Sequence, residues 1–229
     1  MIDDVLIATN ARQAAGGPPD RPFITLSYAQ SLDGSIAGID GQPLALSSPP
    51  SLFRTHSLRA RHDGLLVGVG TVRTDDPQLT VRHAPGTSPQ PIVLDTDLRT
   101  PSSARIFRNP RPPWFVAGSP VSPARRAPLV AIGSRVFEVP RAAHGHIDLP
   151  SALGALRTAG LGTVMVEGGA RVLRAFLEAK LVDWLVITIA PCFIAGKPAL
   201  PTGPGSLPGM RFQGWERSGP DLIVWGELA

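Results

Sequence analysis

A carboxylate and two glycines lie where a buried strand passes into a helix, in the segment 163–177 (TVMVEGGARVLRAFL). A helix N-terminus has unpaired N–H groups and a partial positive charge, so it binds phosphate, and Gly168 and Gly169 lack the Cβ atoms that would keep a phosphate from the backbone. Glu167 would repel such a phosphate. We therefore expect Glu167 to face a polar substrate while the glycines hold a cofactor. A turn with a purely structural role is the alternative, and the dinucleotide pattern G-x-G-x-x-G is absent.

A second group of polar residues follows another buried strand, in the segment 68–82 (GVGTVRTDDPQLTVR). Thr71 comes directly after the glycines, and Asp75 and Asp76 precede a proline. Paired acids bind divalent cations in many proteins, but no histidine or further carboxylate stands at ligand spacing here. An aspartate that shapes the turn before the proline is the alternative.

Two arginines and a third aspartate complete the candidate residues. Arg59 (in SLRARHD) and Arg82 (in LTVR) are candidate anchors for an anion, although most arginines are surface residues. Asp33 lies in the Asp-Gly turn of SLDGSIAG, after the first predicted strand. Such turns are mostly structural. In an α/β sheet, however, this turn would lie at the same carboxyl-end crevice as the other loops.

Other catalytic chemistries lack support in the sequence. The pattern G-x-S-x-G is absent, and the single cysteine, Cys192, excludes an internal disulfide or a cysteine metal cluster. We expect Cys192 to be a buried, inert thiol. The only histidine cluster, His144 and His146, is more typical of a loop than of metal ligands, so we expect no metal site.

The composition is that of an ordinary globular protein, with 43% hydrophobic and 17% charged residues. The net charge of +4 comes from 22 basic and 18 acidic residues, and the arginines are scattered, which argues against nucleic-acid binding. The longest apolar stretch, 181–194, is interrupted by Asp183 and Pro191, so we expect no membrane span. Acids stand where a signal peptide needs positive charge, which favours a cytoplasmic protein.

Strands and helices alternate along the chain. Strands are predicted at 23–28, 65–69, 91–95, 114–118, 129–133, 136–139, 163–166 and 184–190. Helices are predicted at 49–62 (capped by Ser47 or Ser48), 151–159 and 170–179, and a closing hairpin at 210–215 and 221–228. This order favours an α/β fold with a largely parallel sheet, helices on both faces and one antiparallel edge. We expect one domain over residues 22–229, preceded by an N-terminal extension, 1–21.

Taken in order, SLDG, LRARHDGLLVGVGTVRTDDPQLTVR, PIVLDT, VEGGA and LVDWLVITIAP form a set that is more specific than any member. Over residues 22–228 the chain resembles the pyrimidine reductases of riboflavin biosynthesis, which reduce the ribosyl group of a ribosylaminopyrimidine 5′-phosphate to ribityl with NADPH. The zinc deaminase domain fused to some of them has no counterpart here, because its H-x-E and P-C-x-x-C motifs are absent. The resemblance implies a dihydrofolate-reductase-like, three-layer α/β/α fold with a mostly parallel mixed sheet, and a homodimer.

The resemblance also implies roles for individual residues. Hydride would pass from NADPH to the former anomeric carbon of an opened imine, so the protein would supply placement and charge stabilisation. Catalytic roles fall to Glu167 and Asp33. Contacts with NADPH would come from Ala29, Thr71, Asp75, Thr96, Gly168, Gly169, Ala170, Arg171 and Val172. The substrate would be lined by Arg59, Leu79, Arg82 and Glu167, with the arginines on its 5′-phosphate.

Three places depart from the family pattern. Ser27 stands where a lysine is common, Pro43 and Ala45 stand where Ser-x-Trp is common, and Cys192 replaces a lysine after IAP. These changes affect the expected substrate contacts more than the expected NADPH contacts. The alternatives are therefore a reductase of the same fold that acts on another substrate, such as a dihydropterin, and a non-catalytic relative that binds NADPH.

Overall fold

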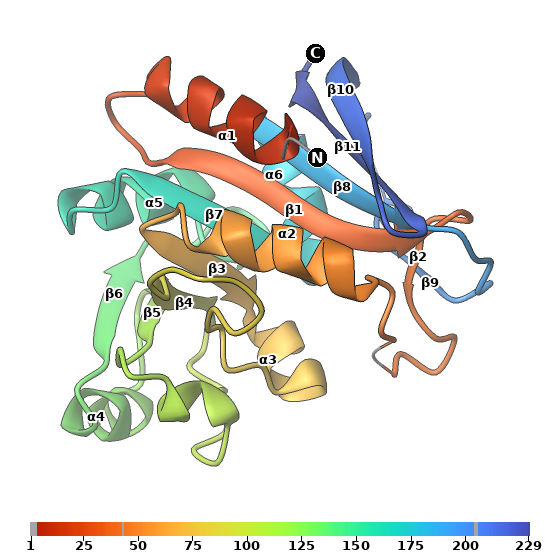
Figure 1. Cartoon of the computed structure of the whole chain (residues 1–229). Coiled ribbons are helices and arrows are strands. Elements are labelled where there is room, and N and C mark those ends of the chain that lie inside the picture. The colour runs from red at the N-terminus through yellow and green to blue at the C-terminus, as the bar shows by residue number, and fades with distance from the viewer. Residues whose placement is uncertain (1–3, 43, 204–205) are drawn as a thin grey trace.

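The computed structural model describes residues 4–42, 44–203 and 206–229, and Pro43, one of the departures above, lies outside them. The strands are β1 (Phe23–Ser31), β2 (Ser35–Ala37), β3 (Gly64–Gly68), β4 (Gln90–Leu94), β5 (Trp114–Gly118), β6 (Arg135–Val139), β7 (Thr163–Gly168), β8 (Trp184–Ala190), β9 (Lys197–Pro198), β10 (Met210–Ser218) and β11 (Asp221–Leu228). Over the described residues, nine of them form one sheet in the order β10-β11-β8-β1-β7-β3-β4-β5-β6 (Figure 1), and β2 pairs with β9 in a short ribbon.

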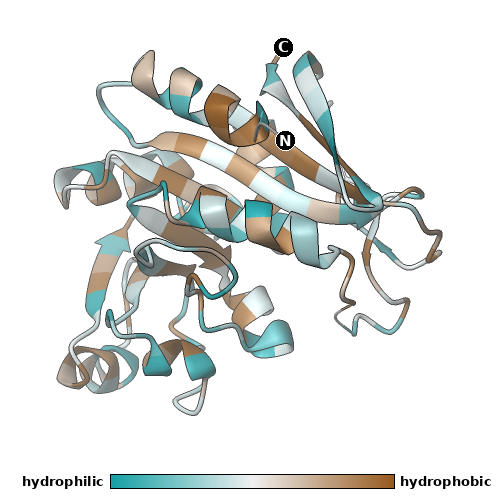
Figure 2. Ribbon diagram, in the orientation of Figure 1, coloured by the Kyte–Doolittle hydropathy of each residue, from teal (hydrophilic) through white to brown (hydrophobic). Residues whose placement is uncertain are grey.

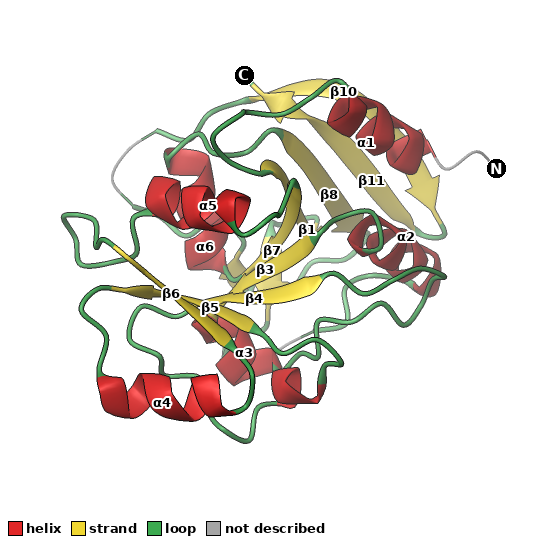
Figure 3. Ribbon diagram, turned by 90° about the vertical axis from the view of Figure 1, so that its left-hand side faces the viewer, coloured by secondary structure: helices red, strands yellow, loops and turns green. Residues whose placement is uncertain are grey.

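Helices cover both faces of this sheet (Figure 3). They are α1 (Asp4–Ala14), α2 (Pro49–Arg59), α3 (Val69–Asp75), α4 (Pro123–Ala131), α5 (Leu149–Thr158) and α6 (Ala170–Glu178), with a 3-10 turn at Arg105–Arg108. Buried side chains of α1 to α4 join one core cluster, and those of α5 and α6 join the other. Successive strand residues such as Leu65 and Leu66 belong to different clusters, as the alternation of a strand requires. Figure 2 shows apolar residues along the central strands.

The strand directions are those predicted from the sequence. From β8 to β6 neighbouring strands pair in parallel, and β11 pairs antiparallel with both β8 and β10. The predicted three-layer α/β/α architecture, with a mostly parallel mixed sheet and an antiparallel C-terminal edge, is confirmed. Among the described residues, no helix is long and apolar enough to span a membrane.

The prediction of a strand at 129–133 is wrong, because these residues end helix α4 and turn toward β6. Leu129 is 7% exposed and packs into the core, whereas Val130 and Ile132 are 47% and 53% exposed. A short apolar run cannot distinguish a strand from one face of a helix. The segment 69–75 is the short helix α3, which is not among the predicted helices. Helix α2 ends at Arg59, before the predicted end at residue 62.

Helix α1 lies within the segment that we expected as an N-terminal extension, and it packs against the sheet (Figure 1). Val5 and Leu6 are buried in the core, and Thr9 accepts a hydrogen bond from the indole N–H of Trp184 at 3.0 Å. Arg12 forms an ion pair with Glu227 of β11 at 2.7 Å. The helix therefore covers apolar surface of β8 and β11 that would otherwise face water.

We predict that Leu6→Ala lowers the free energy of unfolding by about 2–4 kcal/mol, because it leaves a cavity under α1. Its neighbour Ile7 is 56% exposed and provides the matched control. Ile7→Ala should change the unfolding free energy by less than about 0.5 kcal/mol. Urea denaturation of both variants measures the difference, and equal small effects would mean that α1 is not part of the folded core.

His62 is a buried histidine that joins three parts of this core. Its Nδ1 donates to the carbonyl oxygen of Leu58 at 2.7 Å, since a carbonyl only accepts. Its Nε2 therefore accepts, from the hydroxyl of Thr25 at 2.8 Å and the amide of Gln13 at 2.9 Å. Burial lowers the pKa of His62 to about 4, so the ring is neutral at pH 7.

Because the pKa of His62 in the folded chain lies below that of an unfolded histidine, the unfolded chain binds the proton first as the pH falls. We predict that stability is complete above roughly pH 6.5 and declines toward pH 4, with His62 contributing up to about 1.4 kcal/mol per pH unit. His62→Gln should be less stable at pH 7 and show a shallower decline. His144→Gln, at an exposed ring, is the control. Parallel slopes for the wild type and His62→Gln would contradict the assignment.

Candidate active site

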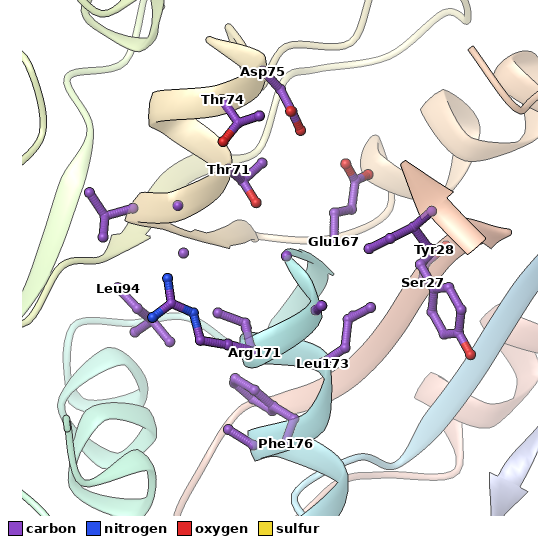
Figure 4. A pocket seen from close by; sticks show the side chains of 18 of the residues that line it. Ser27, Tyr28, Thr71, Thr74, Asp75, Leu94, Glu167, Arg171, Leu173 and Phe176 are labelled. Carbon is purple, nitrogen blue, oxygen red and sulfur yellow. The ribbon is translucent and has the colours of Figure 1, made fainter. Parts of the chain in front are cut away.

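A cavity of about 1050 Å³ opens at the carboxyl ends of the parallel strands. The loops after β1, β3, β4, β7 and β8 meet there, since parallel strands end at the same edge of a sheet. Figure 4 shows Thr71, Thr74 and Asp75 of α3 on one side, Glu167 beside them, and Arg171 from α6 across the turn. The volume is at the upper end of the range for small-molecule pockets, which suits two ligands together.

An ion pair between Arg59 and Glu167 lies in the wall of this cavity. Nε and Nη2 of Arg59 donate to Oε1 and Oε2 of Glu167 at 2.6 and 2.5 Å, a bidentate contact between two side chains that are each 14% exposed. Nη1 of Arg59 donates to the carbonyl oxygen of Thr80 at 3.1 Å. The pair fixes the orientation of the Glu167 side chain, and it joins helix α2 to strand β7.

A break in strand pairing directs Glu167 into the cavity. β3 pairs with β7 so that Leu66 lies opposite Val166 and Val67 lies opposite Gly168, and the register passes over Glu167. Such a bulge leaves one residue unpaired and turns its side chain, and bulges are common beside functional sites. Glu167 therefore faces the cavity between two residues whose positions the core sets.

Helix α2 also holds the loop at Thr80–Arg82 in place. Nδ1 of His56, one turn before Arg59, accepts a hydrogen bond from the backbone N–H of Arg82 at 3.0 Å. Burial, with Arg59 nearby, lowers the pKa of His56 to about 3, which keeps this nitrogen free to accept. Two residues of one helix thus position both the carboxylate and the loop that carries Arg82.

Glycines bring the two sides of the cavity close together at the end of β7. Gly168 and Gly169 have φ values of 112° and 78°, which side chains disfavour. A Cβ at Gly169 would lie 2.9 Å from the hydroxyl oxygen of Thr71, and one at Gly68 would lie 2.7 Å from Val172. Helix α6 begins here, without a side-chain cap on its first N–H groups. The cradle fits the phosphates of a dinucleotide, because a side chain at Gly169 would fill it.

The structure brings most of the predicted site residues together. Those that line the cavity are Ala29, Arg59, Thr71, Asp75, Thr96, Glu167, Gly169, Ala170, Arg171 and Val172. Four others do not line it. Leu79 is 2% exposed in the core, Gly168 shapes the turn, Arg82 donates to the hydroxyl of Thr80 at 2.8 Å, and Asp33 lies in a neighbouring turn.

Asp33 links two loops beside the cavity. Its carboxylate accepts from the hydroxyls of Ser31 and Ser35 at 2.5 and 2.8 Å, and from the backbone N–H groups of Ile194 and Ala195 at 3.0 and 2.8 Å. These hydrogen bonds, those of the serines first, hold the pKa of Asp33 well below its usual range. The carboxylate thus joins the turn after β1 to the loop before β9.

The two adjacent aspartates at the end of α3 have different environments. Asp75 faces the cavity, and partial burial raises the pKa of its carboxyl group. Asp76 has a left-handed φ of 43° at the helix C-cap, and its carboxylate accepts from the backbone N–H of Arg105 at 2.7 Å. Asp76 thus shapes the turn, as one of our alternatives had it. Over the described residues, no group of three or more potential ligands is placed to hold a metal ion.

Four residues that line the cavity were not predicted from the sequence. His144, His146 and Arg99 line the cavity beyond Thr96, and Lys197 lines it from the β2–β9 ribbon. No periodic pattern marks these loop residues, and only the proximity of the two histidines stood out. The expectation that Cys192 is buried is wrong: the thiol is exposed, because it follows the last buried residue of β8 in a surface loop.

Comparisons with known proteins all find proteins of riboflavin biosynthesis. Residues 22–224 match the RibD C-terminal domain family. The chain is 33% identical over 216 residues to the 2,5-diamino-6-ribosylamino-4(3H)-pyrimidinone 5′-phosphate reductase of Archaeoglobus fulgidus, covering 89% of this chain and 97% of that protein. It is 34% identical to the riboflavin biosynthesis protein RibD of Bacillus amyloliquefaciens, covering 88% of this chain and only 56% of that protein.

A solved structure agrees with these sequence matches. The riboflavin biosynthesis reductase Rib7 of Saccharomyces cerevisiae superposes with a TM-score of 0.80 at 28% identity, over 99% of this chain and 100% of that one. The match spans the whole sheet and both helical layers. The chain therefore belongs to the RibD C-terminal domain family.

Proposed function

We propose that this chain is an NADPH-dependent reductase that converts the ribosyl group of a ribosylaminopyrimidine 5′-phosphate to ribityl in riboflavin biosynthesis. The observation that carries this proposal is the Arg59–Glu167 ion pair beside the glycine turn, in a cavity with room for two ligands. The relatives from Archaeoglobus and yeast, which the chain matches over nearly its whole length, carry the names of such reductases.

The cofactor would lie across the start of helix α6. The N–H groups of Ala170 and Arg171 would bind its pyrophosphate, since the first turn of a helix has unpaired donors. Thr71 and Asp75 of α3, which lie near Glu167 in the cavity wall (Figure 4), would contact its nicotinamide end. When bound, NADPH supplies a hydride from its C4 carbon. The chain itself would contribute placement and the exclusion of water.

The substrate would lie against the ion pair. Each oxygen of Glu167 accepts one hydrogen bond from Arg59, and a carboxylate has about four acceptor positions in all. The remaining positions can accept from the hydroxyl and amino groups of the ribosylaminopyrimidine, and stabilise positive charge on its imine. The second N–H of Nη2 of Arg59 remains for the phosphate. Arg82, on the loop that His56 holds, would complete this contact only if its side chain turned into the cavity.

Asp33 would act as a positioning residue. Its hydrogen bonds fix the loops that flank the β2–β9 ribbon, and Ile36, Ala37 and Lys197 of that ribbon line the cavity. We thus assign the catalytic contact to Glu167 alone. Because Asp33 lies outside the cavity wall, its substitution would act through the ribbon.

The proposal includes a homodimer in the cytoplasm. Phe212, Trp215 and Leu222 are 55%, 60% and 36% exposed on the outer strands β10 and β11. An exposed apolar cluster of this kind is typical of an interaction surface. We propose it as the contact between two copies.

Turnover with two substrates tests the proposal against its nearest rivals. Purified protein should oxidise NADPH when given the ribosylaminopyrimidine 5′-phosphate, and should not do so with dihydrofolate. Oxidation with dihydrofolate alone would establish the dihydropterin alternative. Binding of NADPH without oxidation by either compound would identify a non-catalytic relative.

We predict that Glu167→Gln lowers kcat by about 100-fold, because an amide cannot stabilise developing positive charge as a carboxylate does. The dissociation constant of NADPH should change by less than about twofold, since the cofactor contacts lie on α3 and α6. The control is Glu138→Gln on β6. It removes a surface carboxylate that pairs with Arg126 at 3.5 Å, and it should behave as the wild type. Equal losses of turnover and NADPH affinity in Glu167→Gln would contradict this division of roles.

A further inference from the structure

The ribbon of β2 and β9 brings a lysine into the wall of the cavity. This ribbon follows the end of β1 and lies outside the nine-stranded sheet (Figure 1). Lys197 of β9 pairs with Ala37 of β2, and both residues line the cavity. The chain has one other lysine, Lys180, which follows helix α6 and does not line the cavity. The ribbon therefore places a cation at the cavity.

Hydrogen bonds hold the base of this ribbon in place. The carboxylate of Asp33 accepts from the hydroxyl of Ser35 and from the N–H of Ala195, both at 2.8 Å. The hydroxyl oxygen of Ser35 in turn accepts from the N–H of Gly196 at 3.0 Å. Because Gly196 directly precedes Lys197, these contacts fix the backbone from which the lysine extends.

Gly41 makes room for the side chain of Lys197. A Cβ at Gly41 would overlap the ammonium nitrogen of Lys197 and would lie 3.1 Å from its Cε. The end of the lysine therefore lies across the backbone of the turn 38–42. The N–H of Gly41 donates to the carbonyl oxygen of Gly38 at 2.9 Å in this turn, and Gly41 has a φ of 82°, which other residues disfavour. The turn thus supports the ammonium group in the cavity wall, where Gly41 also lies.

No carboxylate compensates the charge of Lys197 in the described part of the chain. Lys197 is an exposed residue, and its ammonium group makes no ion pair or hydrogen bond there. Asp40 of the neighbouring turn does not line the cavity, and it accepts a backbone N–H of that turn at 3.0 Å. The described lining residues of β1, β2, β8, β9, α2 and the segment 38–48 include one other charged side chain, Arg59, which pairs with Glu167. Lys197 is thus the cation on this side of the cavity that is free to bind an anion.

A phosphorylated substrate needs such a cation. A phosphate monoester carries about 1.5 to 2 negative charges at pH 7. The charge of Arg59 is compensated by Glu167, and the side chain of Arg82 donates to Thr80 at 2.8 Å outside the cavity wall. Glu167 repels a phosphate, so a substrate whose reacting carbon lies beside Glu167 should extend its phosphate away from it. The compact ammonium group of a lysine, with three N–H donors, suits a phosphate.

We propose that Lys197 binds the 5′-phosphate of the substrate and sets the preference for phosphorylated over unphosphorylated substrates. The inference rests on the proposed function, because it assigns the far end of the same substrate. Asp33, which lies outside the cavity wall, then positions this lysine through the base of the ribbon. Substrate affinity and the hydride-transfer step thus depend on separate residues, Lys197 and Glu167.

Steady-state kinetics of Lys197→Gln test the inference. KM for the ribosylaminopyrimidine 5′-phosphate should rise about tenfold, as expected for the loss of a hydrogen bond between charged groups. The value of kcat should stay within about twofold, because the contacts of Glu167 are unchanged. The same compound without its phosphate should show the same KM with the wild type and the variant. Lys197→Arg, which keeps the positive charge, should recover most of the affinity, and Lys180→Gln is the control that should match the wild type.

Calorimetric titration with ribose 5-phosphate gives a readout that does not depend on turnover. The wild type should bind ribose 5-phosphate more tightly than ribose, and Lys197→Gln should bind both sugars equally weakly. The dissociation constant of NADPH should change by less than about twofold in this variant, since the proposed cofactor contacts lie on α3 and α6.

The remaining outcomes separate the inference from the proposed function. If Lys197→Gln keeps the wild-type KM and the wild-type affinity for ribose 5-phosphate, the inference is wrong and the reductase proposal stands. A loss of NADPH affinity in place of substrate affinity would also overturn the inference, since Lys197 would then bind a phosphate of the cofactor. A wild-type protein that binds ribose 5-phosphate through Lys197 but reduces no pyrimidine substrate would overturn the proposed function and support the phosphate site.

Discussion

The bidentate ion pair between Arg59 and Glu167 is the contact on which the arrangement of the site depends. It joins the C-terminal end of α2 to the end of strand β7, and the two residues are 108 positions apart in the sequence. Both side chains are mostly buried, so neither charge would be stable there without its partner. The pair holds the Glu167 side chain in a fixed orientation at the edge of the sheet, in the wall of the cavity.

Two backbone features allow the pair to form where a cofactor can reach it. The pairing of β3 with β7 passes over Glu167, which directs its side chain away from the sheet core. The glycines directly after it let α6 begin close to Thr71. The carboxylate of Glu167 therefore stands directly before the glycine turn at which α6 begins.

Local patterns in the sequence were enough to predict most of this architecture. The parallel strands, the helix after Gly169 and the antiparallel edge follow from apolar periodicity and turn residues. The segment 129–133 (LVAIG) was wrongly predicted as a strand, because a short apolar run also suits one buried face of a helix.

The ion pair could not be predicted, since nothing local in the sequence relates Arg59 to Glu167. The same holds for the turn at His144 and His146, whose position depends on Arg141 and the distant Thr96. Leu79 was assigned to the substrate site only through the family resemblance, and its side chain is buried in the core.

A crystal structure with NADP and the ribityl product 5′-phosphate would test the central claim most directly. We expect C4 of the nicotinamide to lie about 3–3.5 Å from C1′ of the product, the range expected for reacting atoms. Glu167 should contact the product while it keeps its ion pair with Arg59. A nicotinamide held away from Glu167, or a product bound outside the cavity that this pair lines, would contradict the account.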